Sequence, residues 1–314
     1  MKGIVYKSTG SWYTVKGEDD IFYPCRIKGK FRIQGIKSTN PVAVGDRVGF
    51  SVEEVDGVKT GIIDEIEERD NFIVRKSVNL SKQTHIIASN IDIVFLVITL
   101  NNPPTSTSFI DRFLVTSRAY RIDTVLLFNK VDSYNDDEIA EVRYLADTYR
   151  EIGYTCIGVS AKTNKNVEQV KEMMQDNVCM FSGHSGVGKS TLVNTIEPSL
   201  HLKTKEISDQ HKQGQHTTTF AEMYDLQNGI RIIDTPGIKG FGIVNMKPEE
   251  IGGYFPEFFE RQGNCKFNNC LHKNEPNCAI KKALEEGEIA LSRYNSYLQM
   301  LEGDDLHYRK NSYD

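Results

Sequence analysis

The chain has 314 residues, of which 39% are hydrophobic and 26% are charged, and its formal net charge is −5. This length suggests two or three domains, and the composition is that of an ordinary soluble protein. The acidic balance gives no support to nucleic-acid binding through bulk charge, although local basic patches stay compatible with it. The longest apolar run, residues 91–100, contains Asp92 and is too short to span a bilayer, and the N-terminus offers no signal-peptide core. We therefore expect a cytoplasmic protein.

The first 70 residues have the pattern of a small β-barrel. Short alternating runs such as 11–15 and 61–66 are separated by turn signals. The pattern predicts a closed barrel of the oligonucleotide/oligosaccharide-binding (OB) type over residues 1–70. Its aromatic side chains could stack on bases or fill the barrel, and the sequence leaves both interpretations open. These side chains are Trp12, Tyr13, Phe22, Tyr23 and Phe31.

Strands and helices alternate in the middle of the chain. Residues 71–90 are polar with weak periodicity, so we expect a mobile linker before this region. Apolar runs at 91–98, 124–128, 154–159 and 178–182 are separated by helical stretches near 108–121, 136–151 and 166–175. The alternation predicts a three-layer α/β domain with a mostly parallel sheet over residues 91–245. Residues 246–314 are expected to be helices around a Cys/His cluster.

A P-loop pattern lies between the predicted strand 178–182 and a predicted helix. Backbone N–H groups of such a glycine-rich loop surround phosphates, Lys189 supplies a cation to the β- and γ-phosphates, and Ser190 can bind Mg²⁺. The alternative is a glycine-rich strand–helix turn without a ligand. The candidate nucleotide-binding residues are Gly183, His184, Ser185, Gly186, Val187, Gly188, Lys189, Ser190 and Thr191.

The segment Asn129-Lys130-Val131-Asp132 follows the strand 124–128 and is a candidate guanine-recognition motif. The Asp132 carboxylate can accept two hydrogen bonds from guanine N1–H and the 2-amino group, a donor pair that adenine lacks. Asn129 can bond the guanine edge and the P-loop, and the stem of Lys130 can lie across the base. Alone the tetrapeptide is ordinary loop composition, but together with a P-loop it predicts guanine binding.

The triplet Ser160-Ala161-Lys162 follows the next predicted strand. There a backbone N–H could reach guanine O6. The triplet is weak by itself, because Ser160 could equally be a helix N-cap.

Asp234-Thr235-Pro236-Gly237 ends the predicted strand 230–233. Asp234 could hold Mg²⁺ through its coordination shell, and the Gly237 N–H could donate to the γ-phosphate. The alternative is a simple Pro-Gly turn. Many GTPases next carry a glutamine that orients the attacking water, but here the residue is Ile238. Isoleucine cannot form a hydrogen bond through its side chain, so the isolated protein should hydrolyse GTP slowly or use another group to position the water.

That other group could be His216, which lies between the P-loop helix and the Asp234 strand. An imidazole can accept or donate a proton near neutral pH, so His216 could orient the water. The alternative is a solvated loop histidine. Thr218 or Thr219 in the same stretch would close on Mg²⁺ and the γ-phosphate. The candidate catalytic set is therefore Lys189, His216, Thr218, Thr219 and Gly237.

The guanine motif precedes the P-loop, whereas the ordinary GTPase order begins with the P-loop. A circular permutation of this kind changes connections and leaves strand contacts intact. The segment after Asp234 then runs directly into the C-terminal region, and the barrel precedes the strand that begins near Ile91. We expect the nucleotide state to set the position of both flanking domains.

Four residues near the C-terminus, Cys265, Cys270, His272 and Cys278, have the spacing C-x4-C-x-H-x5-C. Three thiolates and one imidazole form a closed tetrahedral set, which predicts one structural Zn²⁺ site; buried free thiols are the alternative. The remaining cysteines are scattered in strand-like segments, where a cytosolic chain keeps them reduced.

Taken together, these motifs resemble the circularly permuted small ribosomal subunit (30S) biogenesis GTPases of bacteria, the RsgA type. The resemblance covers nearly the whole chain up to about residue 302 and rests on the motif order 129–132, 183–190, 216–219 and 234–238, with the barrel and the cysteine cluster. It implies a late-acting 30S assembly factor that contacts rRNA through the barrel and the zinc region. It also implies slow GTP hydrolysis that the subunit stimulates, with hydrolysis driving release once the decoding region is mature. We expect a monomer that binds GTP and GDP, with Mg²⁺ accompanying GTP.

The residues themselves leave two other functions open. One is a GTP-regulated RNA-binding module in which hydrolysis is incidental, which Ile238 favours slightly. The other is a translation or signalling GTPase unrelated to subunit assembly, against which the combination of an OB barrel and a zinc cluster argues.

Overall fold

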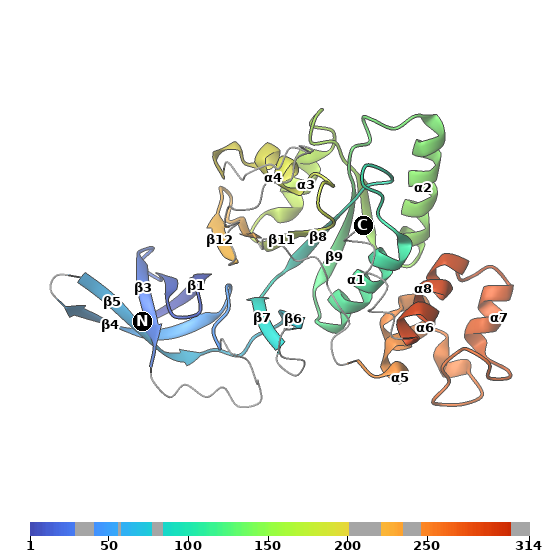
Figure 1. The fold of residues 1–314 in the computed structure, drawn as a ribbon, viewed down its shortest axis with the longest axis horizontal. Coiled ribbons are helices and arrows are strands. Elements are labelled where there is room, and N and C mark those ends of the chain that lie inside the picture. The colour runs from blue at the N-terminus through green and yellow to red at the C-terminus, as the bar shows by residue number, and fades with distance from the viewer. Residues whose placement is uncertain (29–40, 56–57, 77–83, 201–220, 235–245, 303–314) are drawn as a thin grey trace, which may run out of the picture.

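The structure is a computed structural model that describes residues 1–28, 41–55, 58–76, 84–200, 221–234 and 246–302. Three parts lie in a row (Figure 1), with the N-terminal strands at one end and the C-terminal helices at the other. Among the described residues, no helix is long and apolar enough to cross a membrane.

The N-terminal part is a closed five-stranded barrel, as predicted. Its strands follow the order β1-β2-β3-β5-β4, and β4 pairs back to β1. Side chains on alternate positions, including Val5, Val15, Phe50 and Ile63, are at most 2% exposed and fill the interior. The strands are β1 (Lys2–Ser8), β2 (Tyr13–Gly17), β3 (Phe22–Ile27), β4 (Arg47–Val55) and β5 (Val58–Ile66).

The segment expected to be a mobile linker, 71–90, instead contains two antiparallel strands, β6 (Phe72–Lys76) and β7 (Thr84–Ser89). Ile73 and Ala88 are at most 1% exposed and belong to the hydrophobic core of the central domain. Their burial supplies the stability that the weak local pattern did not indicate. A register shift between Ile73 and Val74 interrupts the alternation that would have revealed a strand.

The central part is the predicted three-layer α/β domain. Its parallel strands follow the order β10-β9-β8-β11-β13, and β12 is antiparallel to β13. They are β8 (Ile93–Ile98), β9 (Asp123–Phe128), β10 (Thr155–Gly158), β11 (Val178–Ser182), β12 (Glu222–Asp225) and β13 (Arg231–Asp234). The helices are α1 (Thr107–Ala119), α2 (Asp136–Glu151), α3 (Val167–Met174), α4 (Lys189–Ile196) and the short η1 (Pro198–Leu200).

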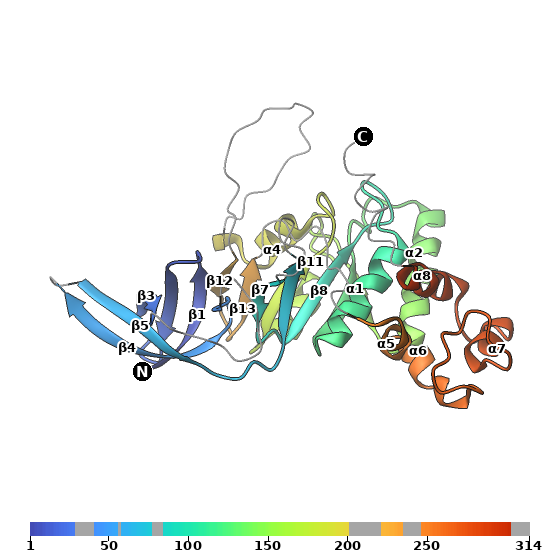
Figure 2. The same cartoon turned by 60° about the horizontal axis from the view of Figure 1, so that its bottom comes forward.

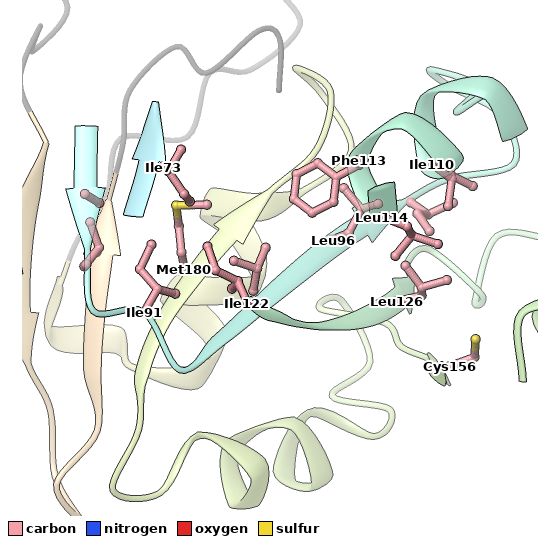
Figure 3. Packing of buried hydrophobic residues seen from close by; sticks show 14 of the residues in the cluster. Ile73, Ile91, Leu96, Ile110, Phe113, Leu114, Ile122, Leu126, Cys156 and Met180 are labelled. Carbon is pink, nitrogen blue, oxygen red and sulfur yellow. The ribbon is translucent and has the colours of Figure 1, made fainter. Parts of the chain in front are cut away.

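Two hydrophobic clusters cover the two faces of this sheet. The cluster under α1 and α2 contains Phe113 and also reaches Ile73 of β6 and Met180 of β11, as Figure 3 shows. The cluster under α3 and α4 is built on alternate residues of the same strands, among them Phe95 and Phe181. The near-continuous apolar strands thus face helices on both sides, as a buried parallel sheet requires.

The barrel joins the central sheet through β12, which lies between β1 and β13 (Figure 2). Lys7 of β1 pairs with Glu222 of β12 in register, and the two side chains form a 3.2 Å ion pair. Asp225 accepts hydrogen bonds from Tyr6 and, over 2.8 Å, from Lys16. These contacts attach the barrel to β12.

The C-terminal part consists of short helices packed around aromatic residues. They are α5 (Pro248–Ile251), η2 (Gly252–Tyr254), α6 (Pro256–Phe259), η3 (Gln262–Asn264), α7 (Ala279–Glu285) and α8 (Leu291–Leu301). Phe255 and Phe258 are fully buried and contact Tyr297 of α8, so the aromatic run at 254–259 mainly serves packing, although Phe259 is exposed. Helix α8 lies beside α1 (Figures 1 and 2).

Candidate nucleotide-binding and metal sites

The candidate nucleotide-binding segments follow the carboxyl ends of three parallel strands. The guanine motif follows β9, the Ser-Ala-Lys triplet follows β10 and the P-loop follows β11. Since parallel strands end at the same edge of a sheet, these loops are brought together there, at the usual place for a ligand in an open α/β sheet.

Three glycines give the P-loop a backbone that other residues would strain. Gly183, Gly186 and Gly188 have positive φ angles of 138°, 87° and 98°. A Cβ at Gly183 would lie 2.4 Å from the Val97 carbonyl oxygen, and one at Gly188 would lie 2.5 Å from Asn129 Nδ2. The loop therefore passes close to both β8 and the guanine motif before α4 begins at Lys189.

Lys189 is the charged side chain of the P-loop. Its Nζ donates to the carbonyl oxygens of Gly183 and His184, each over 2.7 Å. Burial lowers the pKa of Lys189 to about 8, while the nearby negative charge of Asp234 acts in the opposite direction. The ammonium and this carboxylate therefore belong to one electrostatic site, with Ser190 and Thr191 on the first turn of the same helix.

The guanine motif is tied directly to the P-loop. The buried Asn129 donates from Nδ2 to the Val187 carbonyl oxygen over 2.8 Å, and its Oδ1 has no partner among the described residues. Lys130 donates from Nζ to the carbonyl oxygens of Gly186, over 2.9 Å, and of Asn102. Burial lowers the pKa of Lys130. The tie between Asn129 and the P-loop is the one that the sequence predicted.

Asp132 and Ser160 meet next to this motif. Ser160 Oγ donates to Asp132 Oδ1 over 2.6 Å and accepts from the Thr163 N–H over 3.1 Å. Ser160 is fully buried, whereas Asp132 is exposed. Ser160 is not a helix N-cap, because α3 begins at Val167. The hydroxyl instead orients the carboxylate. Ala161 and Lys162 continue this loop, Ala161 accepting a 3.2 Å hydrogen bond from Thr195 on its carbonyl oxygen.

The loop after β8 also reaches this site, a contact that the sequence analysis did not predict. Tyr134 Oη accepts from the Leu100 N–H over 2.9 Å and donates to the Asn129 carbonyl oxygen over 3.0 Å. Asn101 Nδ2 donates to Glu138 Oε1 over 2.6 Å. A tyrosine two residues beyond the guanine motif was the one available signal, and it does not identify a partner.

The P-loop contacts α1 through a pair of rings. The imidazole of His184 lies with its centroid 4.0 Å from that of Phe109, at an interplanar angle of 33°. Burial lowers the pKa of His184, as does the positive charge of Lys189. This histidine is therefore held against α1 in its neutral form near pH 7.

The four predicted metal ligands converge in the C-terminal part. Their ligand atoms all lie within 4.8 Å of one another, and Nδ1 of His272 is 3.6 Å from Cys265 Sγ and 3.3 Å from Cys278 Sγ. Such separations fit the edges of a tetrahedron with metal–ligand distances of about 2.0–2.3 Å. The set Cys265, Cys270, His272 and Cys278 is therefore consistent with a zinc site, which scattered free thiols would not form.

The backbone around His272 is held by two tyrosines of α8. Tyr294 donates to the His272 carbonyl oxygen over 2.6 Å, and Tyr297 donates to the Leu271 carbonyl oxygen over 2.9 Å. His272 is 3% exposed, and burial lowers its pKa, which favours the neutral imidazole that a metal needs.

Several predicted site residues lie outside the described residues. They are His216, Thr218, Thr219 and Gly237, together with the neighbouring Thr235, Pro236 and Ile238. Their roles remain predictions.

A guanine motif that precedes its P-loop in the chain, on a parallel sheet, defines a circularly permuted P-loop GTPase. The chain belongs to the RsgA GTPase family, whose model matches residues 66–244, and the RsgA N-terminal domain model matches residues 2–63.

The relatives agree over the full length. The chain is 71% identical to the small ribosomal subunit biogenesis GTPase RsgA of Christiangramia forsetii, covering 100% of this chain and 99% of the relative. The protein of the same name from Flavobacterium johnsoniae is 67% identical, with 100% and 96% covered. Among solved structures, YjeQ from Thermotoga maritima superposes with a TM-score of 0.78 at 35% identity, covering 96% of this chain and 97% of YjeQ. YloQ, a circularly permuted GTPase, superposes with a TM-score of 0.73 at 32% identity, covering 96% of this chain and 94% of YloQ.

Proposed function

We propose that this protein is a monomeric cytoplasmic GTPase that acts in late maturation of the 30S ribosomal subunit. It hydrolyses GTP slowly alone and faster on the subunit. The observation that carries this proposal is 71% identity over the whole chain to a small ribosomal subunit biogenesis GTPase. The loops after β9, β10 and β11 and the cysteine cluster support it.

Guanine recognition is assigned to the loops after β9 and β10. Asp132 accepts from guanine N1–H and the 2-amino group, and the bond from Ser160 orients its carboxylate. Asn129 connects the base to the P-loop through its bond to Val187. Lys130 covers the base with its stem. Val131, Ala161 and Lys162 complete these loops.

Hydrolysis is assigned to the P-loop and the segments around it. Lys189 neutralises charge that develops on the phosphates, helped by the amide of Gly237. Mg²⁺, held by Ser190 and Asp234, would supply further positive charge at the phosphates. Thr218 or Thr219 would close on this site, and His216 would orient the attacking water in place of the missing glutamine.

The cysteine cluster is assigned to one structural Zn²⁺ ion. A full set of four protein ligands leaves no open position for a substrate, so the metal would stabilise the fold of the C-terminal part. The ion would hold together the 265–278 segment, in which the backbone forms turns and bends and no helix or strand.

Contact with rRNA is assigned in part to exposed aromatic residues of the barrel. Trp12 is 41% exposed, and the Arg26 guanidinium lies 3.9 Å from its ring centroid; Phe22 is 51% exposed. A ring with an adjacent cation suits stacking on a base and attraction to phosphate. Tyr13 and Tyr23 are at most 5% exposed and fill the barrel instead, while Phe31 lies outside the described residues.

We expect both flanking regions to change position with the nucleotide state, because both are attached to elements of the GTPase domain. We assign the barrel to residues 1–70, the GTPase domain to 91–245 with β6 and β7 packed against it, and the zinc-binding region to 246–314. The barrel is attached to β12 and the zinc-binding region to α1, and both of these elements belong to the GTPase domain.

Sedimentation with separated ribosomal subunits tests this function. We expect the protein to pellet with small subunits in the presence of a non-hydrolysable GTP analogue, less with GDP, and not with large subunits. Trp12→Ala should weaken the association, whereas Tyr144→Ala, which removes another exposed aromatic side chain, on α2, should not. Equal binding to both subunits would reject the 30S assignment.

A further inference from the structure

The hydroxyl group of Tyr134 joins the loop after β8 to the guanine motif. This hydroxyl accepts a hydrogen bond from the Leu100 N–H over 2.9 Å and donates one to the Asn129 carbonyl oxygen over 3.0 Å. One atom thus connects the end of β8 with the residue that links the base to the P-loop. Tyr134 is partly buried, which strengthens both bonds relative to bonds in water.

The loop after β8, residues 99–103, touches the proposed base site at two further points. The Asn102 carbonyl oxygen accepts from Lys130 Nζ, so this loop and the P-loop hold the same ammonium. Pro103 lies against Gly186, where an added Cβ would be 3.3 Å from Pro103 Cδ. Asn101 is fixed from the other side by Glu138. Loop 99–103 therefore packs directly against the residues to which we assign guanine binding.

We propose that Tyr134 is a positioning residue for guanine-nucleotide binding, which holds loop 99–103 against the guanine motif so that Asn129 and Lys130 are preorganised. This inference rests on the guanine role proposed above for the motif. Tyr134 itself does not touch the base; it acts through the backbone of Asn129 and through the Asn102 carbonyl.

The hydrogen bonds of Tyr134 are separate from the one that orients Asp132. The Asp132 carboxylate is oriented by Ser160, which lies in the loop after β10 and makes no contact with Tyr134 among the described hydrogen bonds. Loss of the Tyr134 hydroxyl should therefore weaken binding without changing the preference for the guanine 2-amino group. Loss of the Ser160 hydroxyl should reduce that preference.

The test compares nucleotide binding by Tyr134→Phe and by the wild-type full-length protein. Phenylalanine keeps the ring and removes both hydrogen bonds. We expect GDP to dissociate about fivefold to tenfold faster, as the loss of one or two such bonds suggests. Affinity for IDP, which lacks the 2-amino group, should fall by the same factor, leaving the GDP/IDP ratio unchanged. In Ser160→Ala this ratio should fall.

Tyr149→Phe is the matched control. Its hydroxyl donates to Asp111 over 2.8 Å on a buried face of α2, away from the guanine motif. This variant should unfold at a lower temperature but release GDP at the wild-type rate. Asn101→Ala, which removes the side-chain hydrogen bonds to Glu138 and Asn102 but leaves both bonds of the Tyr134 hydroxyl, should raise the GDP dissociation rate less than Tyr134→Phe does.

Two results would overturn the inference: a wild-type GDP dissociation rate in Tyr134→Phe, or an equal increase in Tyr149→Phe, which would mean a general loss of stability. Asp132→Asn distinguishes these failures from failure of the base site itself. If Asp132→Asn weakens GDP binding and Tyr134→Phe does not, only the positioning role is lost. If neither variant affects GDP, the proposed guanine site is wrong.

Discussion

The guanidinium of Arg293 in α8 donates from Nη1 to Asp111 of α1 over 2.6 Å, although 182 positions separate the two residues in the chain. Both side chains are at most 1% exposed. Arg293 also donates from Nε to Glu257 of α6 over 2.8 Å, and Tyr149 of α2 donates to Asp111. This network connects two helices of the central domain with two helices of the C-terminal part.

Replacing Arg293 by methionine should destabilise the protein strongly. The substitution keeps most of the apolar volume but leaves two buried carboxylates without their cation, which costs about 3–5 kcal/mol. Urea unfolding, followed by fluorescence, measures the loss. Arg47→Ala is the control, since Arg47 pairs with Asp70 at an exposed position and its loss should cost less than about 1 kcal/mol. Equal losses in the two variants would contradict a special role for the buried network.

Asp132→Asn should change the base preference. An amide can donate to the C2 carbonyl group of xanthine but cannot accept from both donors of guanine, so GDP should bind on the order of a hundredfold more weakly and XDP more tightly. Competition against a fluorescent nucleotide gives both dissociation constants. Unchanged affinities for GDP and XDP would show that Asp132 does not read the base.

The cysteine cluster should hold one zinc ion per chain. Cys270→Ser should reduce zinc content and lower the melting temperature, because the metal supplies folding free energy to a region built mostly of turns and short helices. Elemental analysis of the purified protein gives the zinc content. Cys156→Ser, at a cysteine outside the cluster, should retain the metal. Full zinc occupancy in Cys270→Ser would contradict the ligand assignment.

The three cysteines outside the cluster should be unreactive and should make stability depend on alkaline pH. Burial raises the pKa of Cys156 and Cys179 from 9.0 to about 12, and that of Cys25 to about 11. Above pH 9 the unfolded chain loses these protons while the folded chain keeps them. The free energy of unfolding should therefore fall as pH rises from about 9 towards 11–12, by up to about 1.4 kcal/mol per pH unit for each thiol.

Urea midpoints between pH 8.5 and 10.5 measure this dependence. A variant with alanine at Cys25, Cys156 and Cys179 is the control, because tyrosines also titrate in this range. The wild-type protein should lose stability more steeply than the triple variant. Parallel curves, or rapid alkylation of these thiols in the folded protein at pH 8, would show that they are more accessible than the structure indicates.

The sequence predicted the elements whose signals are local. The helix expected at 136–151 is α2 (Asp136–Glu151), where Asn135 and Glu138 form a reciprocal capping box. The strand expected at 124–128 is part of β9 (Asp123–Phe128), because a buried parallel strand is apolar on both faces. The order of the nucleotide motifs was sufficient to recognise the permutation.

The features that the sequence missed depend on long-range contacts. Strands β6 and β7 are stabilised by packing against the central core, which a polar segment with an interrupted alternation does not reveal. Loop 99–103 contacts the guanine motif through the Leu100 N–H and the Asn102 carbonyl oxygen. Nearly every residue has these backbone groups, so the sequence does not mark the contact. The sequence also did not show which aromatic residues of the barrel are exposed. Their exposure depends on strand register, which places Tyr13 inside the barrel and Trp12 outside it.

Steady-state GTP hydrolysis, measured alone and with purified small or large ribosomal subunits, tests the proposed function most directly. We expect slow turnover alone, strong stimulation by small subunits and none by large subunits. His216→Ala should then reduce the stimulated rate if this histidine orients the water, with Thr163→Ala, in the loop after β10, as a comparison outside the proposed catalytic set. Tight GTP binding with no stimulation by small subunits would contradict the proposal and indicate a different activator.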